Sequence, residues 1–311
     1  MALHTLLGAN GTIASALLPV LQAEGQQVRL ISRNPKRIPG TESIAADVLD
    51  YEQVLHAVKG SDIVYMLVGI QYNASVWERD WPVIMRNVIN ACKAANARLI
   101  FFDNAYMYGK VDGDITETTP YRPVSRKGKV RAGVAQMLEA EMRSGALKGI
   151  IARAVDFYGP GVTDKSAAGV LVFANMKKGK KAQWFLNADV PRSYNYTPDA
   201  ARALYMLSQS EDAFGQIWHL PCVSPALTGR QFIQLAAKEM GATNSVTVLP
   251  KWLLKVIGWF NPFMREMQEM QYQDAFPFRF SSAKFEKHFH FTPTSYEAGV
   301  KATAQWYLAQ P

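Results

Sequence analysis

Glycines near the N-terminus have the spacing that lets a backbone wrap around a phosphate group. Gly8 and Gly11 lie in residues 8–14, between an apolar run that predicts a strand and a stretch that predicts a helix. Gly8 allows a tight turn, Gly11 leaves room for a pyrophosphate, and Ala14 suits close packing of helix on strand. The N-terminus of the helix would add amide donors and a partial positive charge. The pattern predicts a dinucleotide site that includes Gly8, Asn10, Gly11, Thr12 and Ile13.

The residues after the next expected strand discriminate between the two nicotinamide cofactors. Proteins that bind NAD usually place Asp or Glu there for the ribose 2′-hydroxyl, whereas an Arg accommodates the 2′-phosphate of NADP. This sequence has Arg33, followed by Lys36 and Arg37, and residues 32–37 contain no carboxylate. A guanidinium can form two parallel hydrogen bonds to a phosphate. The sequence therefore favours NADP over NAD.

Short apolar runs alternate with helical patterns through the first half of the chain, which indicates βαβ units and a parallel sheet. Strands are expected at residues 3–7, 28–32, 43–46, 63–68, 98–102 and 149–153, and helices at residues 12–24, 51–59, 81–95 and 130–143. Right-handed crossovers would wind them into an α/β fold, a doubly wound parallel Rossmann sheet. We expect a dinucleotide-binding core over residues 1–158, to which later segments return, and a smaller, mainly substrate-binding C-terminal lobe over residues 159–311.

The expected C-terminal lobe contains two helix starts and one unusual aromatic segment. Thr228 with Gln231, and Thr294 with Glu297, have the spacing of capping boxes. Residues 249–263 are amphipathic and aromatic, like a helix that lies at a membrane interface. The small number of charges on the polar face favours instead a helix that covers an apolar substrate pocket. The sequence leaves open whether residues 250–263 meet a membrane or a ligand.

Composition and charge argue against several classes of protein. The chain has 311 residues and a net charge of +8, spread without an aromatic-interleaved basic patch, so we expect no nucleic acid partner. No apolar run reaches the roughly 18 residues of a membrane span. Cys92 and Cys222 are interpreted as buried thiols, and the N-terminus lacks the basic flank of a signal peptide, which predicts a cytoplasmic protein. The histidines lack metal-ligand spacing, so no metal is expected.

Further sequence blocks extend along the whole chain, and they are residues 46–48, 68–69, 104–109, 153–160, 192–201 and 291–307. Together with the glycine loop they resemble the extended short-chain dehydrogenase/reductase family, the NAD-dependent epimerase/dehydratase group, and in particular its atypical members. The resemblance implies further cofactor contacts by Asp47, Val48, Val68, Gly69 and Val155.

The chain departs from that family at the residues that would do the chemistry. The family transfers a hydride with a Tyr as acid or base, a Ser that orients the carbonyl, and a Lys four residues after the Tyr. By this resemblance Ser125 stands at the Tyr position and Asn104 at the Ser position, while Lys129 is retained to hold ribose. A serine hydroxyl is a far weaker acid than a phenol, whose pKa is about 10. Asn104 can still donate a hydrogen bond to a carbonyl oxygen.

The missing proton donor has several candidate replacements, and they are Tyr72, Tyr106, Tyr108 and Tyr158; Asp103 and Asp156 also lie near the expected site. Tyr72 follows the fourth expected strand, near the expected nicotinamide, and Tyr106 follows Asn104. A carboxylate would need a raised pKa to serve as an acid. Tyr108 and Tyr158 stand where the family carries Tyr for packing. The candidate catalytic residues are therefore Asn104, Lys129, Tyr72 and Tyr106.

Two hypotheses follow from the sequence. The first is an NADP(H)-binding oxidoreductase or epimerase-like enzyme that acts on a small carbonyl or hydroxyl substrate between the two lobes by an atypical site. The alternative is a non-catalytic NADP(H)-binding redox sensor or regulatory protein. Retention of Lys129 and of a complete substrate lobe favours the enzyme. The sequence does not identify the substrate, gives no firm membrane signal and is compatible with a homodimer.

Overall fold

The computed structural model describes residues 1–164 and 166–311, which form two compact units. Unit 1 comprises Met1–Met107, Arg126–Arg153 and Ala200–Trp218, and unit 2 comprises Tyr108–Ser125, Ala154–Asp199 and His219–Pro311. Residues 108–125 and 154–158 lie within the range expected for the core but belong to unit 2, whereas residues 200–218 are a later segment that belongs to unit 1.

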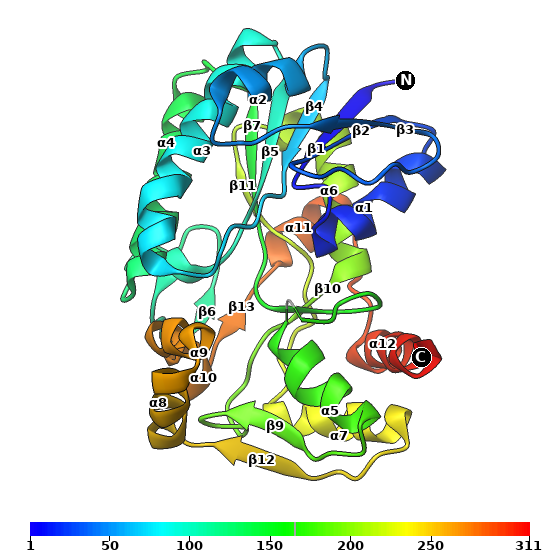
Figure 1. The fold of residues 1–311 in the computed structure, drawn as a ribbon, viewed down its shortest axis with the longest axis vertical. Helices are drawn as coiled ribbons and strands as arrows, with labels where there is room; N and C mark the ends of the chain where they lie inside the picture. Colours follow the sequence, from blue (N-terminus) through cyan, green and yellow to red (C-terminus); the bar gives the residue numbers. More distant parts are fainter. Residues whose placement is uncertain (165) are drawn as a thin grey trace. The chain divides into compact units, whose positions relative to one another are not determined.

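Unit 1 is built on a seven-stranded sheet in the order β11-β7-β5-β4-β1-β2-β3 (Figure 1). The strands are β1 Leu3–Leu7, β2 Gln27–Ser32, β3 Thr41–Ala45, β4 Ile63–Met66, β5 Arg98–Asp103, β7 Gly149–Arg153 and β11 Ile217–His219. Neighbouring strands from β3 to β7 pair in parallel. All four residues of β4 are buried, as expected of a parallel strand covered on both faces. The doubly wound Rossmann sheet is confirmed.

The helices of unit 1 connect these strands as crossovers, and they are α1 Thr12–Ala23, α2 Tyr51–Val58, α3 Ala74–Ala94, α4 Arg126–Arg143 and most of α6 Thr197–Gln209. Two of them begin earlier than the sequence pattern indicates. Helix α3 begins at Ala74 rather than residue 81, because the Asn73 side chain caps it by accepting a 3.0 Å hydrogen bond from the Val76 amide. Pro82 lies inside α3 without ending it. Helix α4 begins at Arg126 rather than residue 130.

Unit 2 contains short strand pairs, namely β6 Asp114–Ile115 with β13 Arg279–Phe280, β8 Phe157–Tyr158 with β10 Asn195–Tyr196, and β9 Ala182–Phe185 with β12 Val246–Leu249. Its helices are η2 Gly169–Phe173, α5 Ala174–Lys177, α7 Gly229–Met240, α8 Lys251–Phe260, α9 Pro262–Met267, η4 Gln268–Met270, α10 Tyr272–Ala275, α11 Ala283–Phe289 and α12 Tyr296–Ala309. The short 3-10 turns elsewhere are η1 Tyr106–Tyr108 and η3 Glu211–Ala213.

The two expected capping boxes have different outcomes. Thr228 and Gln231 form both reciprocal bonds of the box at the start of α7, which confirms that prediction. At α12 the prediction is wrong by one residue, because Ser295 caps the helix by accepting a hydrogen bond from the Ala298 amide. Thr294 is engaged elsewhere, since its hydroxyl donates to Asp199 Oδ1 at 2.8 Å.

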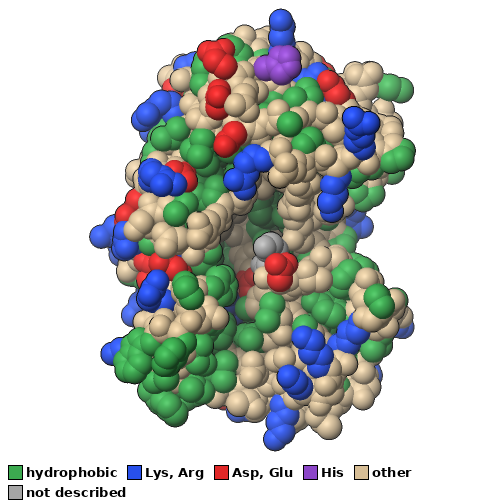
Figure 2. All heavy atoms as spheres, viewed as in Figure 1, with side chains coloured by type: hydrophobic (Ala, Val, Ile, Leu, Met, Phe, Trp, Pro, Cys, Tyr) green, Lys and Arg blue, Asp and Glu red, His purple; other side chains and the backbone are tan. Residues whose placement is uncertain are grey.

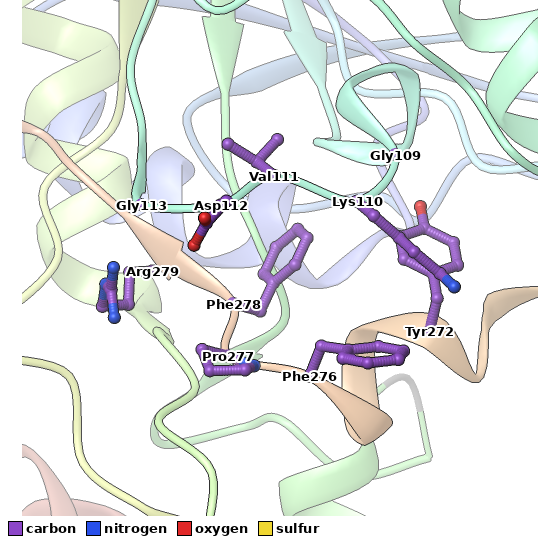
Figure 3. Close-up of a pocket in the computed structure, with 10 residues that line it drawn as sticks. All are labelled: Gly109, Lys110, Val111, Asp112, Gly113, Tyr272, Phe276, Pro277, Phe278 and Arg279. Carbon is purple, nitrogen blue, oxygen red and sulfur yellow. The ribbon is translucent and has the colours of Figure 1, made fainter.

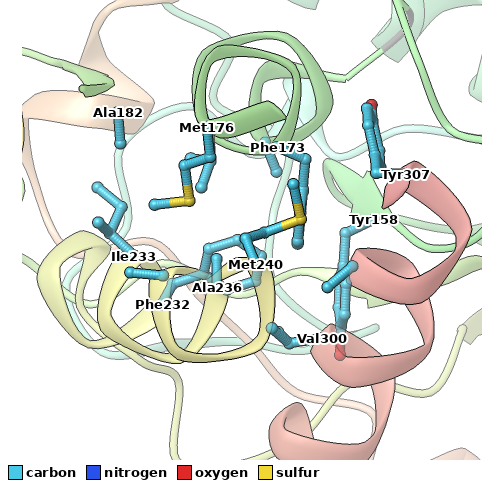
Figure 4. Close-up of a cluster of buried hydrophobic side chains, with 14 of the residues drawn as sticks. Tyr158, Phe173, Met176, Ala182, Phe232, Ile233, Ala236, Met240, Val300 and Tyr307 are labelled. Atoms are coloured by element: carbon cyan, nitrogen blue, oxygen red, sulfur yellow. The ribbon is translucent and has the colours of Figure 1, made fainter. Parts of the chain in front are cut away.

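The hydrophobic core of unit 2 forms where α7 and α12 pack on η2 (Figure 4). Phe232 of α7 lies edge-on to Tyr158, with ring centroids 5.4 Å apart, and Phe173 of η2 stacks on Tyr307 at 5.3 Å. A Cβ at Gly299 would lie 2.6 Å from the Tyr158 Oη, so this glycine lets α12 approach the tyrosine. Cys92 and Cys222 are buried free thiols, as expected. Among the described residues, no helix is long and apolar enough to cross a membrane.

Candidate active site

The glycine loop joins the end of β1 to the start of α1. Gly8 has a φ of +92°, and a Cβ there would lie 2.8 Å from the Leu67 carbonyl oxygen, so only glycine fits without strain. Gly11 is the N-cap residue of α1, and a Cβ there would lie 3.2 Å from the Gly8 carbonyl oxygen. Because Gly11 has no side chain to accept a bond, the first amides of α1 are available to an anion. The loop therefore fits a dinucleotide pyrophosphate.

Asn10 ties this loop to the end of β2. Its side-chain amide donates hydrogen bonds to Ser32 Oγ at 3.2 Å and to the Asn34 carbonyl at 3.0 Å. Arg33 lies between those two residues and is exposed, as are Lys36 and Arg37. The structure thus places the three cations at the carboxyl end of β2, beside the segment that Asn10 holds.

The other expected cofactor residues lie at neighbouring strand ends. Asp47 follows β3, and its Oδ1 accepts a 3.0 Å bond from the Leu49 amide. The carbonyl of Val48 accepts a 3.1 Å bond from the Asn87 side chain. Val68 and Gly69 follow β4, where Val68 Cα would approach a Cβ at Gly8 to 2.9 Å. Val155 belongs to unit 2, where its amide donates to Asn195 Oδ1 at 2.7 Å.

A buried ion cluster closes the end of β5. The Asp103 carboxylate accepts bonds from Arg131 Nε at 2.9 Å and from Arg153 Nε at 3.2 Å, and all three side chains are at most 4% exposed. The Arg131 guanidinium also lies 4.4 Å from the Trp81 ring centroid and 4.8 Å from that of Phe101. Asp103 is therefore committed as a hydrogen-bond acceptor between two cations.

Asn104 begins the loop after β5. Its amide donates to Asp103 Oδ1 at 2.8 Å, and its side-chain oxygen accepts a 3.0 Å bond from the Tyr106 amide. The side-chain NH₂ of Asn104 is the group that could donate to a substrate oxygen. Tyr106 stacks on Trp77 with ring centroids 6.1 Å apart and planes 14° from parallel. The catalytic roles of Asn104 and Tyr106 stay predictions.

The buried cations of helix α4 are not at the positions that the sequence pattern indicates. Lys129, expected to hold ribose, is exposed, whereas Lys127 and Arg131 are 0% and 3% exposed. Positions four residues apart lie on one helix face, so Lys127 and Arg131 have the spacing of the family's Tyr and Lys. Ser125 is buried but precedes the helix. Sequence reasoning did not single out Lys127 and Arg131, because it matched the family's Tyr and Lys to Ser125 and Lys129, two residues earlier on the chain.

Tyr72 lies against the buried lysine. Lys127 Nζ is 4.6 Å from the Tyr72 ring centroid, which is the geometry of a cation–π interaction. Trp77 packs edge-on against Tyr72, with ring centroids 5.6 Å apart. Unit 1 therefore brings together Tyr72, Tyr106, Asn104 and Lys127 with the Trp77 ring and leaves Lys129 on the surface.

The remaining candidates belong to unit 2. Tyr158 is packed in the core, as expected, and the Tyr108 hydroxyl lies 2.7 Å from His219 Nε2. Asp156 lies 3.8 Å from Arg192 Nη2, and burial raises the pKa of the Asp156 carboxyl. Arg192 also forms an ion pair with Asp274, whose pKa burial raises to about 6.

Unit 2 also contains a cavity of about 360 Å³ (Figure 3). One wall is the loop Gly109–Gly113, and the other carries Tyr272, Phe276 and Phe278. Lys110 Nζ lies 4.6 Å from the Phe276 ring centroid. Among the described residues, no group of three or more His, Cys, Asp or Glu side chains could hold a metal ion.

The Rossmann sheet and its glycine loop define a dinucleotide-binding protein. Residues 5–220 match the NAD dependent epimerase/dehydratase family, and the chain belongs to that family. This finding confirms the resemblance seen in the sequence blocks and supports a nicotinamide dinucleotide as cofactor.

Among curated proteins, the chain is 24% identical over 252 residues to "Uncharacterized protein y4nL" of Sinorhizobium fredii, covering 78% of this chain and 67% of that protein. It is 27% identical over 127 residues to dTDP-glucose 4,6-dehydratase of Mycobacterium tuberculosis, covering only 38% of each. Among solved structures, UDP-glucose 4-epimerase of Thermus thermophilus, in complex with NAD, gives a TM-score of 0.81 at 20% identity, with 99% of each chain covered. At that identity, the structural likeness shows the fold alone.

Proposed function

We propose that the chain is an NADP(H)-dependent oxidoreductase or epimerase-like enzyme for a small carbonyl or hydroxyl substrate, in which Lys127 replaces the family's tyrosine. The observation that carries this proposal is the buried pair Lys127 and Arg131 on one face of α4. Fully buried lysines are rare unless they are paired or functional, because desolvation of an ammonium is costly. Lys127 is held against Tyr72, the Tyr72 ring packs on Trp77, and Trp77 stacks on Tyr106 of the loop that begins at Asn104.

Each residue of this cluster has a role that its contacts support. Bound NADP(H) supplies or accepts a hydride. The Asn104 side-chain amide donates a hydrogen bond to the substrate oxygen, and the Lys127 ammonium gives that oxygen its proton, as a general acid does. Arg131 is a positioning residue, since it fixes Asp103 and, through the Asp103 carboxylate, the Asn104 backbone amide.

The test compares two lysines of the same helix. Lys127→Met should lower turnover about 100-fold or more, the usual contribution of general acid catalysis, while NADPH affinity changes little. Lys129→Met is the matched control, because Lys129 is exposed on α4, and its turnover should stay near that of the parent protein. NADPH oxidation would be followed with small aldehydes and ketones, and NADPH binding by its fluorescence. UDP-glucose and dTDP-glucose, for which similar proteins are named, would be incubated with NADP⁺ and followed by chromatography of the sugar nucleotide, because epimerisation and dehydration return the hydride and leave no net change in NADPH.

Equal turnover of Lys127→Met and the parent protein would refute the role of Lys127. Tight NADPH binding with no turnover of any compound in the panel would instead favour the non-catalytic sensor. A large loss in Lys129→Met, with Lys127→Met unaffected, would restore the assignment made from the sequence.

NADP preference is the second part of the proposal, and it departs from the NAD found in several similar structures. Arg33→Ala should weaken NADPH binding about 10- to 100-fold, the loss of one or two hydrogen bonds to a charged group, and leave NADH binding unchanged. Arg86→Ala is the control, because Arg86 is exposed on α3 of the same unit. Equal affinity of the parent protein for NADPH and NADH, measured by titration, would contradict the preference.

A further inference from the structure

Helices α8 and α9 of unit 2 expose large apolar side chains. Trp252, Trp259 and Phe260 of α8 are 67%, 69% and 84% exposed, and Phe263 of α9 is 53% exposed. Figure 2 shows hydrophobic side chains gathered over the place where Figure 1 draws these helices. Side chains so exposed do not cover a pocket, so the interpretation of this segment as a cover for an apolar substrate pocket is not supported.

Helices α8 and α9 form a hairpin, and the spacing of these residues places them on one exposed face of it. Trp252, Val256 and Trp259 are three or four residues apart, so they lie on one face of α8. Leu254 and Gly258 are the buried residues of the helix. A Cβ at Gly258 would lie 3.3 Å from the Arg265 Cα, so the glycine lets α8 and α9 pack closely.

Two residues in the turn between α8 and α9 stabilise the start of α9. Asn261 caps α9 by accepting a 3.1 Å bond from the Met264 amide, and Pro262 takes the first helical position. Phe260 and Phe263 flank this turn, so the tip of the hairpin is aromatic. The packing and the cap hold the apolar face in place.

The exposed charges around this face have one sign. Within residues 251–267, all of which the structure describes, the exposed charged side chains are Lys251, Lys255 and Arg265. Glu266 is half-buried. A two-fold contact between copies of this chain would set the same patch against itself and bring these cations together. A negatively charged surface complements them.

We propose that the α8–α9 hairpin binds the surface of a phospholipid bilayer that contains anionic lipids. Amphipathic helices with Trp and Phe on the apolar face and Lys or Arg beside it lie in the interfacial plane of a membrane. Indole rings prefer the headgroup level, and each nearby cation adds attraction to an anionic surface. The protein attaches peripherally, with Phe260 and Phe263 inserted and Lys251 and Lys255 at the headgroups.

Vesicle co-sedimentation of the full chain tests the proposal, with phosphatidylcholine vesicles that contain or lack phosphatidylglycerol. The parent protein should bind the anionic vesicles at least 10-fold more tightly than the neutral ones, and 0.5 M salt should weaken that binding. Trp259→Ser with Phe260→Ser should lower the anionic-vesicle affinity at least 10-fold. Leu308→Ser is the matched control, because Leu308 is 52% exposed on α12 and lies outside the hairpin.

Charge reversal separates the cationic contribution from the apolar one. Lys251→Glu with Lys255→Glu should reduce binding to anionic vesicles and not to neutral ones, whereas Lys287→Glu with Lys301→Glu, on α11 and α12, should have a much smaller effect. Circular dichroism melts would verify that each variant is folded. The proposal is overturned by three outcomes: no vesicle binding by the parent protein, full binding by the Trp259→Ser and Phe260→Ser variant, or light scattering that shows this variant converting a dimer to monomers.

Discussion

Asp103 offers the most direct test of how unit 1 holds its candidate site. Asp103→Asn keeps the shape of the side chain and an oxygen that can still accept the Asn104 amide, but it removes the charge between Arg131 and Arg153. Both guanidiniums are at most 4% exposed and would be left buried without the carboxylate. Breaking a buried ion pair from one side costs about 3–5 kcal/mol, because the other charge stays desolvated.

An exposed ion pair in the same chain supplies the matched control. Arg230 Nε lies 2.6 Å from Asp189 Oδ1, as close as a buried pair, but the two side chains are 55% and 63% exposed. Asp189→Asn should therefore lower the free energy of unfolding by no more than about 1 kcal/mol. Urea unfolding at pH 7, followed by tryptophan fluorescence, measures both variants. If Asp103→Asn lowers the free energy of unfolding by no more than Asp189→Asn does, burial does not increase the contribution of this cluster to stability, and the argument is refuted.

Two further predictions concern β1 and the loop that follows it. Burial lowers the pKa of His4 to about 4, against the partial opposition of Asp62, so its neutral form contributes stability above pH 6.5 that is lost as the pH falls towards 4. The loss should approach about 3 kcal/mol, and it should be smaller in His4→Asn but unchanged in the exposed His56→Asn, as urea unfolding at several pH values would show. Gly8→Ala should lower the melting temperature clearly more than Gly60→Ala. Both glycines have positive φ, but of the two only Gly8 has backbone atoms within 4 Å of the added Cβ. Equal melting temperatures of the two glycine variants would contradict the argument about Gly8. An unchanged pH dependence of stability in His4→Asn would contradict the argument about His4.

The sheet could be predicted from the sequence because buried parallel strands are continuous apolar runs. The expected strands over residues 3–7 and 149–153 coincide with β1 and β7, and the other four differ by one or two residues at their ends. Helix starts were harder to place, because a side-chain cap such as Asn73 defines α3 while Pro82 interrupts the pattern. At α12 the cap is Ser295, while the neighbouring Thr294 bonds to Asp199, which is far away in the sequence.

The candidate site was predicted in part. The glycine loop follows from local sequence, because its conformation depends on Gly8 and on the close approach of residues 67–68. The buried face of α4 was not predicted, because the family's motif was matched at Ser125 and Lys129. The helical period does indicate that face, since Leu138 and Val134 are buried and positions 131 and 127 continue it. Nothing in local sequence indicates that Arg131 meets Asp103, which requires the packing of α4 on the sheet.

The order in which the chain builds unit 1 has a consequence for its synthesis. The β11 edge of the sheet comes from residues that follow Ala154–Asp199, a segment of unit 2. Until those residues leave the ribosome, β7 lacks the bonds that it makes with the β11 side, such as the 3.1 Å bond from the Ile151 amide to the Gln216 carbonyl. An unpaired edge strand is a template for association with other chains. A nascent chain released or stalled near residue 200 should therefore be more prone to aggregate than one that has passed residue 219.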